Sequence, residues 1–400
     1  MNLNIITRML KEVSPNILWK LFRNMCVSSA VNLHKFNKRI KRGEKFFPAF
    51  VFISLTNKCD LHCKGCWVSK TNPAQELSFK QLDNIIQISK KNGSKFFGLL
   101  GGEPLMYDNL FKIIEKHSDC YFQLFTNGSF LTNDTAKKLS KSGNVTPLIS
   151  IEGFEKESNE RRSQTKPVFQ NAVTAVKNCS ENKLFTGVAS SICKSNFKEL
   201  VSKEYLSFLI KNKVQYLWYY IYRPVGAEPS PELALDQNEI IALRKFIVDM
   251  RVEVPLIIVD AYWDADGNAL CPGAVGLSHH ISPNGAVEFC PPFQFACDFL
   301  NETGGNLEAI FNNSQFLNEL RRFVSDTTRG CIIMEHPDKL YDFLKRYSAE
   351  DSSGRNSAYN ELKEMRICQS HGTENAKIPE KSFIYKIMKK KYFFGFGAYG

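Results

Sequence analysis

Three cysteines stand close together in one short segment, and their type and spacing suit iron–sulfur chemistry. Cys59, Cys63 and Cys66 occur in the order Cys-Asp-Leu-His-Cys-Lys-Gly-Cys, directly after a predicted strand at residues 50–55. One loop therefore presents three thiolates at the carboxyl end of a strand. Iron–sulfur cubanes are normally held by four thiolates, so three leave one iron open to bind and polarise a small molecule. The spacing thus indicates a chemically active cluster.

A zinc site and an electron-transfer site are the two alternatives for this loop. Structural zinc sites commonly contain paired C-x-x-C spacings and four ligands in a tetrahedral set, whereas this loop has an unpaired C-x-x-x-C-x-x-C. A ferredoxin-type carrier would also hold a cluster through such cysteines. An iron–sulfur electron-transfer protein and a zinc-stabilised binding module therefore both stay open on the cysteines alone.

A glycine-rich turn follows the second predicted strand, at residues 95–100. It consists of Gly101, Gly102, Glu103 and Pro104. Paired glycines let the backbone approach a ligand closely, and a carboxylate pairs with an ammonium group. Alone, such a segment is more often a plain turn, but its position at the end of the next β unit after the cysteine loop favours a ligand-binding role.

Together, the cysteine loop and the Gly-Gly-Glu-Pro turn resemble the radical S-adenosylmethionine (SAM) superfamily. The resemblance implies a catalytic 4Fe–4S cluster on Cys59, Cys63 and Cys66, with SAM on the open iron. It implies reductive cleavage of SAM to a 5′-deoxyadenosyl radical, which abstracts hydrogen from a substrate. It also implies a low-potential electron donor of the flavodoxin or ferredoxin type.

The strand ends add SAM-binding residues by the same resemblance. In the superfamily the GGEP element holds the methionyl amino group of SAM, and the following strand ends contact SAM or substrate. The corresponding residues here are Gly101, Gly102, Glu103, Pro104, Thr126, Asn127, Ser150 and Ser190. Two departures accompany them. Glu152 stands where Asp is usual, and Trp67 follows the third cysteine, whereas the family usually has an aromatic residue before it.

A second group of cysteines begins at Cys271. Gly285 and Cys290 follow it in a C-x13-G-x4-C spacing, and Cys331 stands further along the chain. This pattern resembles the start of a SPASM or twitch auxiliary-cluster domain. Met334 occupies the position where the second cysteine of a C-x-x-C pair is expected. The resemblance therefore implies one auxiliary iron–sulfur cluster rather than two.

The fourth ligand of this auxiliary cluster has three candidates in the sequence. They are Cys297, His336 and Cys368, since both Cys and His can ligate iron in such clusters. Of these we favour Cys297. The alternative is that the second group consists of free thiols in a core, but neighbouring prolines indicate loops. Four cysteines on predicted helices or strands are assigned to the core: Cys26, Cys120, Cys179 and Cys193.

Alternating β and α segments carry the cysteine loop and the glycine-rich turn. Six short β-rich runs alternate with amphipathic stretches between residues 48 and 228, which predicts an α/β fold with a parallel sheet. With the resemblance, this becomes a partial (β/α)6 TIM-like barrel followed by a small cysteine-rich C-terminal domain. The predicted divisions are a basic amphipathic helical segment at 1–47, the barrel at 48–228, a SPASM- or twitch-like auxiliary iron–sulfur domain at 229–345, and a C-terminal extension with a basic aromatic tail at 346–400.

Basic residues gather at both ends of the chain, whose formal net charge is +11. Residues 1–47 contain ten basic and two acidic side chains, and residues 376–400 contain six and one, with aromatic residues interleaved. No recognised nucleic-acid-binding motif accompanies them, so we expect no nucleic acid partner. Two alternatives stay open: the ends cover the open edge of the barrel, or they make peripheral contact with an anionic membrane.

Composition and the resemblance also bear on the cellular location and the substrate class. The sequence has neither a secretory signal nor an uninterrupted apolar stretch of membrane-spanning length. With twelve cysteines and no export signal, we expect a cytoplasmic protein that uses thiols to bind metal, at the inner membrane surface if its ends bind lipid. The resemblance implies an enzyme that acts on a peptide or on a lipid- or membrane-linked molecule.

Overall fold

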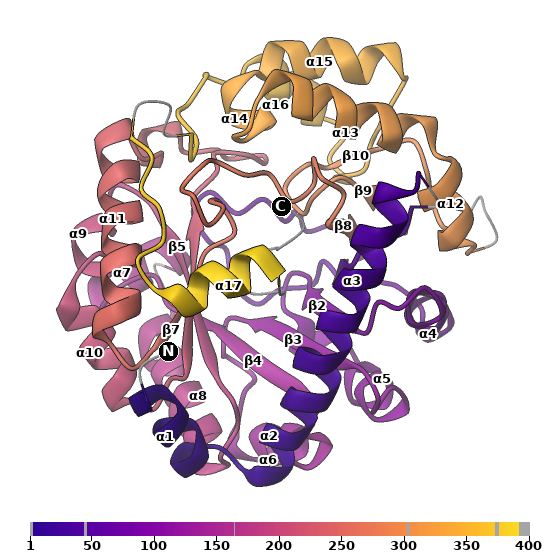
Figure 1. Cartoon of the computed structure of the whole chain (residues 1–400). Coiled ribbons are helices and arrows are strands. Elements are labelled where there is room, and N and C mark those ends of the chain that lie inside the picture. The colour runs from indigo at the N-terminus through magenta and orange to yellow at the C-terminus, as the bar shows by residue number, and fades with distance from the viewer. Residues whose placement is uncertain (1–2, 44–45, 164, 302–304, 373–375, 392–400) are drawn as a thin grey trace.

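A nine-stranded sheet forms the centre of the computed structural model, which describes residues 3–43, 46–163, 165–301, 305–372 and 376–391 (Figure 1). The strand order is β7-β6-β5-β4-β3-β2-β1-β8-β9. All neighbouring strands run parallel except β8 and β9, which are antiparallel. The strands are β1 Phe50–Ser54, β2 Phe96–Leu100, β3 Tyr121–Thr126, β4 Val145–Ser150, β5 Gly187–Ile192, β6 Tyr216–Ile221, β7 Ile257–Val259, β8 Ser278–Ile281 and β9 Val287–Glu288.

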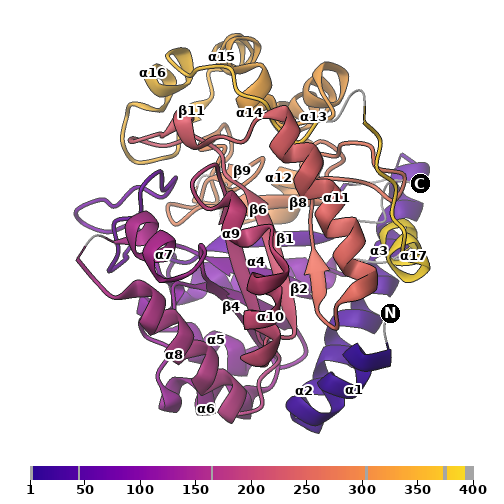
Figure 2. The ribbon, with the colours of Figure 1, turned by 90° about the vertical axis from the view of Figure 1, so that its left-hand side faces the viewer.

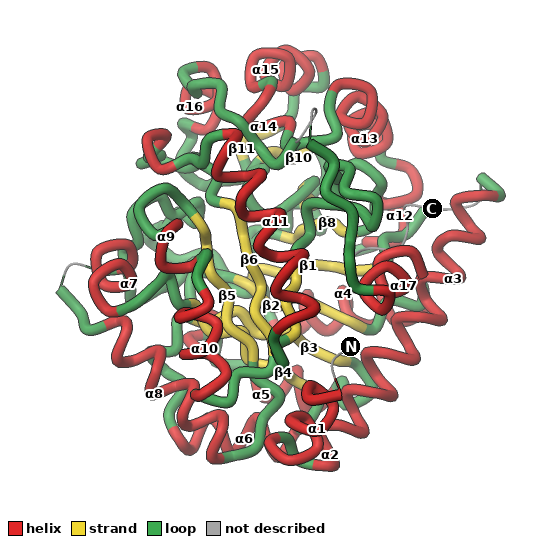
Figure 3. Tube along the Cα trace, turned by 60° about the vertical axis from the view of Figure 1, so that its left-hand side comes forward, coloured by secondary structure: helices red, strands yellow, loops and turns green. Residues whose placement is uncertain are grey.

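Helices follow β1 to β6 along the chain and surround the strands (Figure 3). This order confirms the predicted α/β fold with six β/α units. The helices of these units, with the one that follows them, are α4 Phe79–Lys91, α5 Leu110–Lys116, α6 Asn133–Ser142, α7 Glu155–Arg162, α8 Val168–Glu181, α9 Phe197–Leu200, α10 Lys203–Lys211 and α11 Gln237–Glu253.

Capping boxes in the sequence explain where α4 and α11 begin. Ser78 Oγ accepts a hydrogen bond from the Gln81 N–H at 3.2 Å, and Gln81 Oε1 accepts one from the Ser78 N–H at 2.9 Å. Asp236 and Glu239 make the same reciprocal pair at the start of α11, with distances of 3.0 and 2.8 Å. Such pairs satisfy backbone donors that a helix cannot satisfy itself.

Within the described residues, the central sheet has three strands beyond the six that the sequence predicts. β7 pairs with β6, β8 pairs with β1, and β9 completes that edge. They were missed because β7 has three residues and β9 two, while β8 reads Ser-His-His-Ile and lacks a run of apolar residues. The predicted boundary at residue 228 stays a prediction, and the sheet itself continues across it.

Short helices precede and follow this sheet. The N-terminal segment forms α1 Leu3–Glu12, α2 Pro15–Lys20, a π-helix Leu21–Val27 and α3 Ser28–Lys41, which run along one side of the molecule (Figures 1 and 2). The C-terminal elements are β10 Phe295–Ala296, α12 Leu307–Asn313, α13 Gln315–Thr327, α14 Ile332–Glu335, α15 Pro337–Arg346, β11 Glu350–Asp351, α16 Ala358–Lys363 and α17 Phe383–Lys391.

These terminal segments pack against the sheet in different places. Helices α13 to α16 gather together at one end of the molecule, at the top of Figure 1. Helix α17 packs on β7, where the Ile258 N–H donates to Tyr385 Oη at 3.0 Å. The aromatic tail predicted to follow it, residues 392–400, lies outside the described residues. None of the described helices is both long and apolar enough to cross a membrane.

Candidate active site

The cysteine loop leaves β1 at its carboxyl end and leads to α4. Cys59, Cys63 and Cys66 all lie on this loop, where the Cys66 N–H donates to the Cys63 carbonyl at 3.2 Å. Cys63 and Cys66 line a cavity of about 360 Å³. Cys59 lies beside the end of β3, with Asn127 Nδ2 at 3.9 Å from its Sγ.

The donor set of this loop fits an iron–sulfur cluster better than a zinc ion. Desolvation raises the pKa of all three thiols, and that of Cys63 to about 11. A metal centre offsets this effect, because it binds the thiolate form. Within the described part of the chain, the three Sγ atoms do not all lie within 4.8 Å of one another. Sulfur ligands of one tetrahedral zinc ion lie about 3.8 Å apart, so this loop is wider than a zinc site.

The Gly-Gly-Glu-Pro turn lies directly against the cysteine loop. The Gly102 N–H donates to the Thr56 carbonyl at 2.8 Å, and the Glu103 N–H donates to the Lys58 carbonyl at 2.7 Å. A Cβ on Gly102 would lie 2.2 Å from the Lys58 oxygen, and one on Gly101 would lie 2.6 Å from the Thr56 oxygen. The close approach of the loop backbone therefore requires both glycines, and their contact with SAM stays a prediction.

Glu103 is fully buried and is turned toward the end of β3. Its Oε1 accepts from Thr126 Oγ1 at 2.7 Å, and its Oε2 accepts from the Asn127 N–H at 2.7 Å. Asn127 Nδ2 in turn donates to Asp60 Oδ1 on the cysteine loop at 2.8 Å. Burial raises the pKa of Glu103 to about 7 against the effect of these hydrogen bonds. Glu103, Thr126 and Asn127 thus support the loop, Pro104 begins a short 3-10 helix beside them, and SAM binding by all four stays a prediction.

The two serines predicted to contact SAM differ in position. Ser150 lines the cavity at the end of β4. Ser190 is buried, with its Oγ donating to the Ile151 carbonyl at 2.7 Å and lying 2.8 Å from Tyr205 Oη on α10. Because side chains alternate along a strand, the next residue, Ser191, lines the cavity instead. Contact between Ser190 and SAM stays a prediction, and Ser191 is the better placed of the two.

Arg162 is a cavity residue that the sequence prediction missed. Its Nη2 and Nε donate to Glu152 Oε1 at 2.6 and 3.1 Å, and its Nη1 lies 4.0 Å from Cys63 Sγ. Glu152 is buried and also accepts from the Ser191 N–H at 2.7 Å. Arg162 therefore places a fixed positive charge beside the cysteine loop. The only signal was two consecutive arginines after the fourth strand, which is equally typical of an ordinary helix end.

The second cysteine group lines another part of the same cavity. Cys271, Cys290 and Cys331 are all exposed to it, together with Arg223. The Arg223 guanidinium lies 5.5 Å from the centre of the Tyr262 ring. Burial raises the pKa of Cys271 to about 11 and also raises that of Cys290, while the charge of Arg223 acts in the opposite direction. Three thiols beside one cation fit a negatively charged iron–sulfur cluster.

The predicted fourth ligands lie elsewhere. Among the described residues that line the cavity, Cys297, His336 and Cys368 are absent. The thiols of Cys297 and Cys368 each donate to a backbone carbonyl, at 3.5 and 3.3 Å, and His336 stands between α14 and α15. His371 lines the cavity instead, and burial lowers its pKa to about 3, so its imidazole is neutral. The sequence contained no spacing that singled out His371.

Aromatic side chains form much of the wall of the cavity. The rings of Trp218 and Tyr220 stack with their centres 5.2 Å apart. The aromatic residues of the wall are Phe52, Trp67, Phe125, Trp218, Tyr220, Tyr222, Tyr262 and Phe289. Such a wall limits the water that reaches the two cysteine groups.

Comparison with known protein families identifies one domain in this chain. Residues 53–194 match the family model described as the radical SAM superfamily. The sporulation killing factor maturation protein SkfB of Bacillus subtilis is 28% identical over 160 residues, which cover 39% of this chain and 39% of SkfB. The AdoMet-dependent heme synthase of Methanosarcina barkeri is 26% identical over 157 residues, which cover 38% of this chain and 45% of the synthase. The chain thus matches less than half the length of these two relatives.

Longer matches also occur. The PqqA peptide cyclase of Rhizobium meliloti is 24% identical over 71% of this chain and 79% of its own. The structure of Streptococcus suis SuiB bound to precursor peptide SuiA superposes with a TM-score of 0.60 at 20% identity, over 72% of this chain and 70% of SuiB. The structure of anSMEcpe with bound AdoMet superposes with a TM-score of 0.53 at 15% identity, over 67% of this chain and 81% of anSMEcpe. These two structures share the fold of this chain.

Proposed function

Because residues 53–194 form a radical SAM domain, we propose that this chain is a radical SAM enzyme that modifies a ribosomally made peptide. One observation carries the proposal: a single cavity is lined by residues of both cysteine groups. A peptide substrate is supported by similarity to proteins named as a maturation protein and a peptide cyclase, and by the likeness to SuiB, which was solved with its precursor peptide.

Both cysteine groups have assigned cofactors in this proposal. Cys59, Cys63 and Cys66 would hold a 4Fe–4S cluster, and the second group would hold one auxiliary cluster. The cluster with SAM on its open iron supplies, once reduced, a 5′-deoxyadenosyl radical that abstracts hydrogen from the substrate. The remaining chemistry is that of binding, orientation and exclusion of water, which the chain's own residues provide.

Residues around the cysteine loop would bind and orient SAM. Arg162, fixed by Glu152 at 2.6 Å, has the charge and position to bind the SAM carboxylate. The Ser150 hydroxyl faces the same cavity. Glu103 and Asn127 keep the loop in place through the hydrogen bonds that join β2, β3 and the loop. The aromatic wall would keep water from quenching the radical.

An electron donor of the flavodoxin or ferredoxin type is part of the proposal, because such clusters require a low-potential electron. Lys38, Lys41 and Arg42 are exposed at the end of α3 and offer a basic surface for an acidic donor. We propose the cytoplasm as the location, since thiols there stay reduced.

A membrane-linked substrate is the second candidate, and one observation favours it. Trp19 and Phe22 on the N-terminal helices are 59% and 57% exposed, and their ring centres lie 6.3 Å apart. Exposed aromatic rings beside basic side chains are typical of helices that rest on anionic membranes. Co-sedimentation with anionic vesicles, but not with neutral ones, and its loss in Trp19→Ser would support this candidate. Equal recovery with both kinds of vesicle would exclude it.

Release of 5′-deoxyadenosine tests the leading proposal directly. The protein is reconstituted with iron and sulfide without oxygen, and SAM is then added with dithionite. We expect release by the parent and none by Cys63→Ala. Cys26→Ala is the matched control and should behave as the parent. The sequence assigned Cys26 to the core, but the structure places it exposed on the π-helix.

Two outcomes would replace the proposal. A colourless protein that holds zinc would favour the binding-module alternative. An iron–sulfur protein that never cleaves SAM would favour the electron-transfer alternative. The substrate class is read separately, as a SAM-dependent mass change in short peptides encoded beside the gene.

A further inference from the structure

His371 lies between the chain segments of two cysteines in the second group. Its Nε2 is 2.8 Å from the carbonyl oxygen of Leu270, the residue before Cys271. The residue before it, Ser370, accepts the Cys331 N–H on its Oγ at 3.0 Å. His371 is therefore tied to the segment of Cys271 on one side and to that of Cys331 on the other, and it lines the same cavity as both.

The hydrogen bond to Leu270 decides which ring nitrogen of His371 is available to a metal. A carbonyl oxygen can only accept, so Nε2 carries the proton and donates it. In a neutral imidazole Nδ1 then keeps its lone pair. Histidines that bind metals commonly donate their other ring N–H to a backbone carbonyl or a carboxylate, which fixes the tautomer and the ring orientation. His371 has this arrangement.

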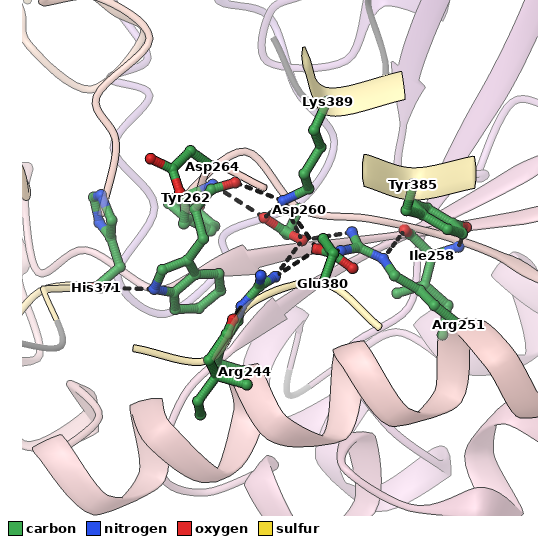
Figure 4. Close-up of polar contacts among 12 residues, drawn as sticks. Arg244, Arg251, Ile258, Asp260, Tyr262, Asp264, His371, Glu380, Tyr385 and Lys389 are labelled. Atoms are coloured by element: carbon green, nitrogen blue, oxygen red, sulfur yellow. Dashed lines mark hydrogen bonds and ion pairs between the residues drawn. The ribbon is translucent and has the colours of Figure 1, made fainter. Parts of the chain in front are cut away.

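A buried group of charges fixes the C-terminal segment that carries His371 (Figure 4). Its members all have fully buried side chains and come from α11, the end of β7 and residues 380–389: Arg244, Arg251, Asp260, Glu380 and Lys389. Arg244 Nη1 lies 2.9 Å from Glu380 Oε1, and Lys389 Nζ lies 3.1 Å from Asp260 Oδ1. We call these five residues the charge cluster.

Trp263 connects the charge cluster to His371. The Arg244 guanidinium lies 5.3 Å from the centre of the Trp263 ring, and Trp263 Nε1 donates to the His371 carbonyl at 3.0 Å. The His371 ring also packs against Tyr262, with ring centres 4.9 Å apart. Backbone and ring are therefore both held, which a metal ligand requires.

We propose that His371 is the fourth protein ligand of one auxiliary iron–sulfur cluster, bound through Nδ1 together with Cys271, Cys290 and Cys331. This inference rests on the proposed function for the presence of that cluster. A neutral imidazole in place of a thiolate removes one negative charge, and histidine ligation raises the potential of iron–sulfur centres. The cluster therefore has a higher potential than an all-cysteine cluster would have in the same site.

The test isolates the second site in the full chain. Cys59, Cys63 and Cys66 are all replaced by Ala, so that any remaining cluster belongs to the second group. The protein is produced with 15N-labelled histidine, reconstituted and reduced, and its iron content and nitrogen couplings are measured by pulsed EPR. We expect one cluster with strong coupling to a histidine nitrogen. Adding His371→Ala should remove the coupling and lower the iron content.

Further variants separate ligation from folding. His371→Cys should restore the iron, lack the nitrogen coupling and lower the reduction potential, which a merely structural histidine would not do. His336→Ala and Cys368→Ala are matched controls from the same region, and both should keep the iron and the coupling.

Three results would overturn the proposal. They are a cluster without histidine coupling, a coupling that persists in His371→Ala, and a triple alanine variant that holds no iron–sulfur cluster. Release of 5′-deoxyadenosine by the parent is measured independently of all three. A failure of this assignment is therefore distinct from a failure of the proposed radical chemistry.

Discussion

The two cysteine groups line one cavity but are assembled in opposite ways. Cys59, Cys63 and Cys66 come from one loop after one strand, so their spacing is a local property of the chain. The second group comes from segments spread over residues 271–331, and its proposed fourth ligand follows at His371. A local site needs only its loop to be held, whereas a dispersed site requires much of the C-terminal region to be folded first.

Their supports differ accordingly. Backbone hydrogen bonds to Gly102 and Glu103 hold the cysteine loop, at 2.8 and 2.7 Å. At the second site, the backbone of His371 is held by Trp263, whose ring lies against Arg244 of the charge cluster. The difference predicts that single changes damage one site while the other stays intact.

The largest contrast is expected between Cys63→Ala and Cys290→Ala. Loss of a ligand to the SAM-binding cluster should lower 5′-deoxyadenosine release by about a thousandfold or more. Cys290→Ala should leave this release within about threefold of the parent while it abolishes the peptide product. Both are measured by chromatography of the same reaction. Equal losses of nucleoside release in the two variants would mean that the groups act as one site.

The next effect concerns the charge cluster. Asp260→Asn would leave Arg244, Arg251 and Lys389 with Glu380 as their one anion in the cluster. Breaking a buried ion pair from one side costs about 3 kcal/mol or more, because the remaining charges stay desolvated. We expect a lower free energy of unfolding by denaturant and faster hydrogen exchange at residues 371–372 and 376–391.

Asp249→Asn is the matched control for that change. Its ion pair is partly exposed, with 59% of the Lys381 side chain and 26% of the Asp249 side chain accessible, so its loss should cost about 1 kcal/mol or less. Iron at the cysteine loop should be retained in both variants. If Asp260→Asn removes that iron as well, the two supports are not separate.

A smaller loss of stability is expected when the loop support is broken. Gly102→Ala places a Cβ 2.2 Å from the Lys58 carbonyl, and relieving the overlap should cost about 2 kcal/mol and displace the cysteine loop. Iron bound to the loop should fall while iron at the second site persists. Gly372→Ala is the control near His371, since among the described residues its Cβ would meet only Glu335 Oε1, at 3.5 Å. Equal iron losses at both sites in Gly102→Ala would contradict this picture.

The features that the sequence could predict are the local ones, as the contrast between the two cysteine groups suggests. The α/β fold, the six β/α units and the loop of three cysteines were predictable, because each depends on residues close together in the chain. The direction of the side chains on β5 was not predictable: Ser191 lines the cavity, while the predicted SAM contact, Ser190, bonds to Ile151 and Tyr205 and stays a prediction. A shift of one residue reverses the face of a strand, and composition alone does not fix it.

Long-range features were beyond the sequence. Arg162 could not be told from a basic residue at a helix end, and its role depends on Glu152 and Cys63 lying beside it. His371 becomes a candidate only because its Nε2 lies 2.8 Å from the carbonyl of Leu270, the residue before Cys271, a contact across about a hundred residues that no sequence pattern shows. The sequence favoured Cys297, but no pattern in the sequence could show that its thiol donates to the Tyr347 carbonyl and is not among the described residues that line the cavity.

The smallest effect we predict is a change in SAM affinity from Arg162→Lys. The lysine keeps the charge but loses the planar group whose Nε and Nη2 both reach Glu152 Oε1. We expect about a tenfold higher KM for SAM with little change in kcat, because orientation rather than charge is lost. Arg322→Lys is the control, since Arg322 pairs with Glu319 at 3.5 Å on the surface and is not part of the cavity wall. If Arg162→Lys leaves the KM unchanged, Arg162 only braces Glu152, and the SAM carboxylate is bound by another group near the loop.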